Sequence, residues 1–145
     1  MEILTVKKQT NGYLLNGNMS VPECDGNREY EMIKVWLAEG NTPEPEFTQE
    51  ELAVQEQAKL KQAKAQALTQ IVVEVEDMSF DGNETARLNM ISAIQASELL
   101  GQTESPWKLA DNMVQTVTTA ELKQALALAI QEVGRIVMVT DIEEL

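Results

Sequence analysis

The residues at the start of the chain fall into two alternating sets, as on the two faces of a short strand. Residues 3–8 have this alternation, and Asn11-Gly12 follows them. Asn-Gly is a strong signal for a tight hairpin turn, so residues 13–15 are expected to return as a second strand. A further Asn-Gly pair at residues 16–17 predicts either another turn or a bulge before residues 19–22.

A short amphipathic helix is expected next, over about residues 28–39. Asp25 or Asn27 can cap its start, because their side-chain oxygens accept hydrogen bonds from the first free backbone N–H groups. The apolar face of the helix combines four residues: Met32, Ile33, Trp36 and Leu37. Gly40 follows at the position where a left-handed residue ends a helix.

An acidic segment with two prolines separates this helix from the next one. Pro43 and Pro45 each disfavour helical backbone at the preceding residue, so residues 41–47 are predicted to form an extended linker. Residues 23–56 hold ten acidic and two basic residues. This stretch is therefore the strongest electrostatic feature of the chain.

The longest helical pattern starts after Thr48. Residues 49–75 contain no glycine or proline and are rich in Ala, Gln, Lys and Leu. We therefore expect a long central helix over residues 48–77. The β-branched run at residues 71–75 favours a strand, so the pattern leaves open an earlier end of the helix.

Coiled-coil spacing runs along this expected helix. Steps of four and three residues give seven positions, six of them apolar: Val54, Ala58, Lys61, Ala65, Leu68, Val72 and Val75. The helix either packs on its own chain or joins copies of itself or a partner. An alanine-rich seam buries little area per residue, so this helix alone predicts a weak oligomer. Val54, Leu68 and Val72 are the candidate interaction residues on it.

The last part of the chain, residues 78–145, has a better defined pattern. Residues 78–80 predict a short strand that Asp81-Gly82 closes. Asn83 can cap a helix over about residues 84–100.

A second hairpin and a final helix follow. Asp111-Asn112 predicts a two-residue turn between residues 107–109 and 113–117. Residues 118–121, Thr-Thr-Ala-Glu, form a capping box, in which hydroxyl and carboxylate each bond a free backbone N–H group. The final helix is expected to begin there.

Together these elements predict an α+β chain with four segments. Residues 1–40 form a hairpin and a short helix that serve as a docking unit, and residues 41–47 form the acidic linker. Residues 48–77 form the long helix, a possible oligomerisation segment. Residues 78–145 form a small α+β domain in the order strand, helix, hairpin, helix.

Composition and charge narrow the possible partners. The chain has 145 residues, of which 43% are hydrophobic but only two each are Trp, Tyr and Phe. Its 24 acidic and 11 basic residues give a formal net charge of −13, which argues against nucleic acid and against anionic membrane surfaces. No run approaches the ~20 apolar residues of a membrane helix, and residues 1–8 lack a signal-peptide pattern, so we expect a soluble protein.

The residues that carry most enzyme chemistry are missing or poorly placed. The chain has no histidine, and its one cysteine, Cys24, stands between Glu23 and Asp25, which disfavour a thiolate. The seven glycines form no phosphate-binding loop, and the carboxylates gather where solvation explains them. A carboxylate-based glycan hydrolase lacks positive support. We expect no catalytic residue, no cofactor and no bound metal.

The two tryptophans, Trp36 and Trp107, are the further candidate interaction residues. Each stands beside smaller apolar residues at core spacing, so anchoring of a core is the favoured role of both. Tryptophan is also strongly enriched at interface hot spots, so one of the two can serve a partner.

Two sets of segments carry a resemblance to bacteriophage proteins. The first set comprises residues 12–22, 27–30 and 36–46. It resembles the start of small proteins that tailed bacteriophages encode near their tail-fibre genes. The second set comprises residues 80–82, 86–89, 107–112 and 117–122. It is similar to a phage domain of unknown function that occurs in tail, tail-fibre and fibre-assembly proteins.

The Trp-x-Leu-Ala-Asp-Asn stretch at residues 107–112 is the most specific part of this resemblance. It falls here between the Phe-Asp-Gly turn and the Thr-x-Ala-Glu-Leu helix start. Residues 135–145 extend past the pattern of the domain. The family has no catalytic residues to carry over, so the resemblance implies a setting and no reaction.

The resemblance implies a non-enzymatic phage tail protein. The first hypothesis is a structural subunit or adaptor bound to a tail-fibre, baseplate or tail-tip protein, with a homo-oligomer, preferably a trimer, as its state. The alternative is an assembly chaperone that binds fibre protein transiently and is absent from the virion. The implied location is the host cytoplasm during assembly and, for a subunit, the virion tail afterwards.

Overall fold

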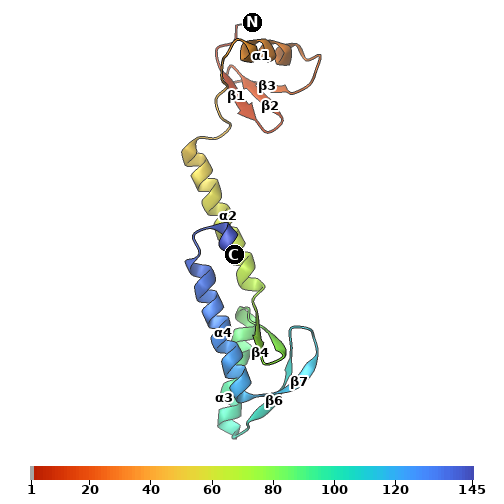
Figure 1. Ribbon diagram of the computed structural model, residues 1–145, viewed down its shortest axis with the longest axis vertical. Coiled ribbons are helices and arrows are strands. Elements are labelled where there is room, and N and C mark those ends of the chain that lie inside the picture. Colours follow the sequence, from red (N-terminus) through yellow and green to blue (C-terminus); the bar gives the residue numbers. More distant parts are fainter. Residues whose placement is uncertain (1) are drawn as a thin grey trace. The chain divides into compact units, whose positions relative to one another are not determined.

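A computed structural model describes residues 2–145, which form an α+β chain (Figure 1). The chain divides into two units, each with a core of its own. Unit 1 ends at Gln55 and unit 2 comprises Glu56–Leu145. The division falls inside helix α2 (Gln49–Thr69), so this helix begins in unit 1 and ends in unit 2.

Unit 1 begins with an antiparallel sheet in the order β1-β2-β3. Its strands are β1 (Val6–Gln9), β2 (Gly12–Leu15) and β3 (Met19–Pro22). The second Asn-Gly pair thus makes a turn, with Asn16 and Gly17 both at positive φ, and the expected hairpin gains a third strand.

The first turn differs from the expected Asn-Gly turn. Gln9 pairs with Gly12, so Thr10 and Asn11 form the turn and Gly12 opens β2. A Cβ at Gly12 would collide with the carbonyl oxygen of Val21 on β3. Glycine is therefore needed here for the close approach of two strands.

Helix α1 (Arg28–Ala38) packs on this sheet and completes the first core. Asn27 caps it, and its Oδ1 accepts a hydrogen bond from the Tyr30 N–H at 2.9 Å. The core buries four aliphatic side chains: Val6, Leu15, Val21 and Ile33. The rings of Tyr13 and Tyr30 stack beside it with their centroids 6.4 Å apart.

The linker at residues 41–47 is extended at Glu44, as the prolines predict, and it is also hydrogen-bonded to the sheet of unit 1. The Lys8 N–H donates to the Glu44 carbonyl oxygen and the Glu44 N–H donates to the Val6 carbonyl oxygen, each at 2.8 Å. Glu44 therefore pairs in parallel with the edge of β1. The prolines on both sides keep Glu44 extended, which makes it suitable to cover a strand edge.

Helix α2 starts as expected and ends earlier than expected. The Thr48 Oγ1 accepts a hydrogen bond from the Glu51 N–H at 3.1 Å at its start. The helix expected to residue 77 is wrong, and the alternative of an end before the β-branched run is confirmed, because α2 ends at Thr69 and strand β4 (Val72–Val75) follows. The β-branched side chains of β4 gain a cross-strand partner there, which a helix would not provide.

Unit 2 contains two antiparallel hairpins and two further helices. Strand β4 pairs with β5 (Met78–Asp81), and helix α3 (Glu84–Leu100) follows. Strand β6 (Glu104–Lys108) pairs with β7 (Val114–Thr118), and helix α4 (Thr119–Met138) follows them. The short strand expected at residues 78–80 is thus one half of a hairpin.

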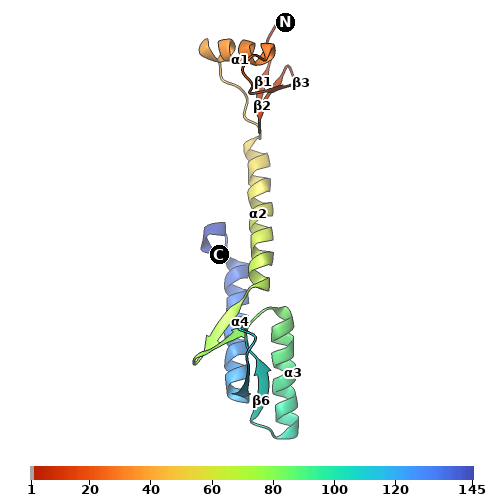
Figure 2. The ribbon, with the colours of Figure 1, turned by 90° about the vertical axis from the view of Figure 1, so that its right-hand side faces the viewer.

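Helices α3 and α4 run alongside each other and enclose the core of unit 2 with the hairpins (Figure 2). Twelve residues form this core: Ile71, Val73, Val75, Phe80, Met90, Ile94, Leu109, Val117, Leu122, Ala125, Ala129 and Ile136. Ala67 and Leu68 at the end of α2 pack against it. The expected boundary at residue 78 is therefore wrong, since the core includes residues before it.

The turn between β4 and β5 places a non-glycine residue in the left-handed region. Glu76 has a φ of 56°. This conformation costs an ordinary residue ~1–2 kcal/mol, whereas glycine adopts it freely and loses ~0.4–1 kcal/mol through unfolded-state entropy. We expect Glu76→Gly to raise the free energy of unfolding of unit 2 by about 0.5–1 kcal/mol, measured by urea denaturation.

Asp77→Gly is the matched control for this variant. Asp77 is the other residue of the same turn and is not at positive φ. Glycine there brings only the entropy cost, so a small loss of stability is expected. Equal gains from the two substitutions would contradict the assignment of strain to Glu76.

Candidate functional site

An exposed apolar surface lies on helix α1 of unit 1. Met32, Val35, Trp36 and Glu39 follow one another at the spacing that brings side chains to one face of a helix. With Ile3 they line a pocket of about 370 Å³. We call these five residues the Trp36 surface.

The apolar residues of the Trp36 surface differ in their exposure to solvent and in their contact with the core. Val35 is 61% exposed, and the neighbouring Leu4 is 72% exposed. Trp36 is half-buried and also packs against the core of unit 1. Asn41 fixes the end of the helix, since its Nδ2 donates to the Trp36 carbonyl oxygen at 2.9 Å. Trp36 therefore anchors the core with one part of its ring and lines the surface with another.

Glu39 is the one charged residue among the five of the Trp36 surface. Lys34, the one base of α1 beyond its first residue, pairs with Glu31 at 2.8 Å and Asp25 at 3.1 Å. Lys34 lowers the pKa of Glu31 through a hydrogen bond, and its bonds to Glu31 and Asp25 raise the pKa of Lys34 itself. Glu39 forms no ion pair with another described residue. A basic partner would therefore complement this surface.

Trp107 lies in a pocket of about 450 Å³ at the start of α3 in unit 2. Eight residues line it: Asp81, Asn83, Thr85, Ala86, Asn89, Pro106, Trp107 and Lys108. One of its polar groups serves the fold, because the Asn83 Oδ1 accepts a hydrogen bond from the Ala86 N–H. Trp107 is half-buried and packs against the core.

The structure does not bring Val54, Leu68 and Val72 together on one helix face. Val54 is 69% exposed on α2, whereas Leu68 packs against the core of unit 2. Val72 lies in strand β4 and is 52% exposed. The expected seam is therefore wrong beyond residue 69, since its spacing applies only to helical backbone.

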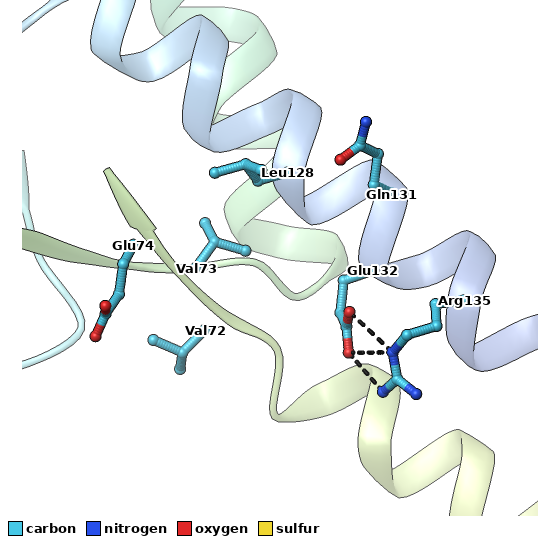
Figure 3. A pocket seen from close by; sticks show the side chains of 7 residues that line it. All are labelled: Val72, Val73, Glu74, Leu128, Gln131, Glu132 and Arg135. Atoms are coloured by element: carbon cyan, nitrogen blue, oxygen red, sulfur yellow. Dashed lines mark hydrogen bonds and ion pairs between the residues drawn. The ribbon is translucent and has the colours of Figure 1, made fainter. Parts of the chain in front are cut away.

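Sequence reasoning missed a groove between β4 and α4. Val72, Val73 and Glu74 form one side of it, and α4 supplies Leu128, Gln131, Glu132 and Arg135 (Figure 3). Its volume is about 540 Å³. The alternation of exposed and buried residues in β4 is the one local signal that could have indicated a groove on this side.

A doubly bonded ion pair lies on the α4 side of the groove. Arg135 Nη2 donates to Glu132 Oε1 at 2.7 Å, and Arg135 Nε donates to Glu132 Oε2 at 3.1 Å. These bonds lower the pKa of Glu132 and raise that of Arg135. The Arg135 charge is therefore compensated within the chain.

The requirements of metal sites, reactive side chains and membrane helices can also be compared with the described residues. Among residues 2–145, no group of three His, Cys, Asp or Glu side chains could hold a metal ion. Cys24 is exposed, and Tyr13 has a raised pKa, first because of burial and then because of the nearby charge of Glu23. Within the same residues, no helix has the length and apolar character to cross a membrane.

Comparison with known proteins identifies a family. The family model described as Domain of unknown function (DUF4376) matches residues 51–137, which is more than half of the chain. The chain belongs to the DUF4376 family. Neither a curated protein nor a solved structure matches it.

The DUF4376 match runs from the first turns of α2 to the last turn of α4. It therefore includes the Trp107 pocket and the β4–α4 groove, whereas the Trp36 surface lies before it. The description of DUF4376 names no activity, so no residue of this chain receives a role from the family.

Proposed function

We propose that this protein is a non-enzymatic component of a bacteriophage tail, a structural subunit or adaptor at the tail fibre, baseplate or tail tip. The phage setting is supported by the resemblance of two sets of segments to phage tail-associated proteins. The first set is residues 12–22, 27–30 and 36–46, and the second is residues 80–82, 86–89, 107–112 and 117–122. On this proposal the protein is made in the host cytoplasm and becomes part of the virion tail.

The single observation that carries the adaptor role is the Trp36 surface. An adaptor must present apolar area to a partner while it keeps its own core intact. Val35 is exposed on this surface, whereas Ile33 on the opposite side of α1 is fully buried. Trp36 supplies the large ring that commonly anchors an interface. The charge of Glu39 adds an attraction for a basic group of the partner.

Helix α2 supports a proposal about oligomeric state. It has 21 residues, and none of them is buried. Helices in proteins owe most of their stability to a packed apolar face. Leu52 and Val54 are exposed on α2, at 46% and 69%. We propose that α2 contacts further copies of this chain, with a trimer as the state that suits a fibre.

Val35→Asp is expected to weaken binding to the tail-fibre protein encoded next to this protein by at least tenfold. The substitution would bury a charge at the interface. The measurement is size-exclusion chromatography with light scattering, on the purified chain alone and with that fibre protein. Ala38→Asp is the matched control, since Ala38 is exposed on α1 but does not line the Trp36 surface.

The outcomes of this test separate the possible roles. A stable complex that Val35→Asp disrupts and Ala38→Asp preserves supports the adaptor. A protein that binds only unassembled fibre chains, and is missing from purified particles by mass spectrometry, is an assembly chaperone. A chain that binds fibre protein in neither form contradicts the proposal.

A further inference from the structure

The hydrogen-bond pattern of the β4–β5 hairpin determines which backbone groups of β4 are free. The Gly82 N–H donates to the Ile71 carbonyl oxygen at 2.7 Å. Bonded and non-bonded pairs alternate in an antiparallel ladder, so Val73 and Val75 exchange hydrogen bonds with β5. The N–H and C=O groups of Val72 and Glu74 therefore point away from β5.

A contact on the other side of the hairpin supports this assignment. Ser79 lies opposite Glu74, so its carbonyl group must point away from β4. It does so, and it accepts a hydrogen bond from the Ala110 N–H at 2.9 Å. Ala110 thus covers the outer edge of β5.

The outer edge of β4 has no such cover within the described residues. Outside the pairing with β5, no backbone hydrogen bond among residues 2–145 involves Val72 or Glu74. Edges are usually protected by a covering segment, a proline, a bulge, charged side chains or a very short strand. Strand β4 has four residues and one charged side chain, Glu74. Glu44 covers β1 and β6 contains Pro106, whereas β4 has neither protection.

The groove beside this edge has room and a surface for one more strand. Figure 3 shows Leu128 next to Val73, with Glu132 and Arg135 joined further along α4. A strand added to β4 would lie over these α4 side chains.

A second copy of the chain fits this edge poorly. Paired strands lie ~4.7–4.9 Å apart, whereas packed helices need ~8–10 Å between their axes. Because α4 already extends beneath the free edge of β4, a symmetric β4–β4 pair would press two α4 helices together. An extended segment with no helix beneath it avoids this clash.

The charge of the hairpin specifies the occupant further. Residues 71–81 contain four acids and no base: Glu74, Glu76, Asp77 and Asp81. Arg135, the base that lines the groove, is already bonded to Glu132. A strand with basic side chains on its outer face would pair with Glu74, and opposite charges on neighbouring strands stabilise a sheet.

We propose that the free edge of β4 is a docking site for an extended, basic segment of a partner protein, which joins the β4–β5 hairpin as a third strand. The backbone of this segment forms hydrogen bonds with Val72 and Glu74. Its inward side chains are small or apolar and contact Leu128 and Val73. Its outward side chains are Lys or Arg and lie beside Glu74. This site is separate from the Trp36 surface and does not depend on the phage setting.

The test uses the full chain, labelled for NMR, and a capped peptide of sequence Thr-Lys-Val-Lys-Val-Lys-Thr. We expect binding with a Kd below about 1 mM and at least tenfold slower hydrogen exchange at the amides of Val72 and Glu74. A peptide with Glu in place of each Lys is expected to bind at least tenfold more weakly.

Two variants separate backbone pairing from charge. Glu74→Pro removes an outward N–H group that the ladder with β5 does not use, so both peptides should lose binding while the signals of α3 and α4 stay in place. With Glu74→Lys, the peptide with Glu should bind more tightly than the peptide with Lys. Glu104→Lys, an equal charge change at an exposed residue of β6, should leave the preference unchanged.

Three results would overturn the proposal. One is unchanged exchange at Val72 and Glu74 in the folded chain with the basic peptide present. Another is binding that survives Glu74→Pro. The last is slower exchange at these amides that rises with protein concentration alone, which would assign the edge to a second copy. None of these results bears on the Val35→Asp test of the adaptor role.

Discussion

Replacing Phe80 with alanine is expected to lower the free energy of unfolding of unit 2 by about 3–5 kcal/mol. Phe80 is the largest of the fully buried side chains and has no exposed area. It lies on β5 opposite Val73, within the core between the hairpins and the helices. Truncation removes the burial of an aromatic ring and leaves a cavity that the packed helices can only partly fill.

Urea denaturation followed by Trp107 fluorescence measures this loss, in a Trp36→Phe background that removes the signal of unit 1. Leu99→Ala is the control, because Leu99 is 80% exposed on α3 and its truncation should change stability by less than about 0.5 kcal/mol. Similar losses for both variants would show that Phe80 does not hold the core together.

Ile33→Ala is expected to unfold unit 1 and leave unit 2 folded. Ile33 is one of only four buried residues in the core of unit 1, and truncation of a buried isoleucine costs about 2–5 kcal/mol. Chains of about 60 residues bury a smaller fraction of their surface than larger domains do, so their stability is low from the start. Unit 1 has little stability to lose.

Amide NMR signals distinguish the two units in this experiment. Signals from unit 1 should collapse towards unfolded positions, while those of α3, α4 and both hairpins of unit 2 persist. Val35→Ala is the control on the same helix, since Val35 is largely exposed. Simultaneous loss of all signals would mean that the two cores fold as one cooperative unit.

The elements that sequence predicted best are those with a local hydrogen-bond signal. Asn27 and Asn83 cap α1 and α3 as expected. The Thr118–Glu121 capping box opens α4, and both of its reciprocal bonds are formed. These bonds join residues three positions apart, so the sequence alone contains both partners.

The β4–β5 hairpin shows why the remaining fold was not predictable. Its turn consists of Glu76 and Asp77, without the glycine or asparagine that usually marks a two-residue turn. The end of α2 depends on the pairing of Val73 with Phe80 and on the packing of Leu68. Tertiary contacts of this kind decide between helix and strand at residues 71–75, which the sequence pattern left open.

The sequence also identified some of the candidate binding sites and missed others. Trp36 was identified because it stands beside smaller apolar residues at core spacing and because tryptophan is enriched at interface hot spots. The groove beside β4 was not, because it combines a strand with α4 residues more than fifty positions later in the chain. The free edge depends on which residues of β4 direct their backbone N–H and C=O groups towards β5 and which direct them outward. No sequence pattern encodes this choice.

The pairing of Glu44 with β1 also determines where this protein can be divided into fragments. A fragment that stops at residue 40 would leave the Lys8 N–H and the Val6 carbonyl group without their partner. It would expose a strand edge and lose the bond from Thr10 to Glu46. An N-terminal fragment should therefore retain the prolines and end within α2, near Gln55, where the two units divide.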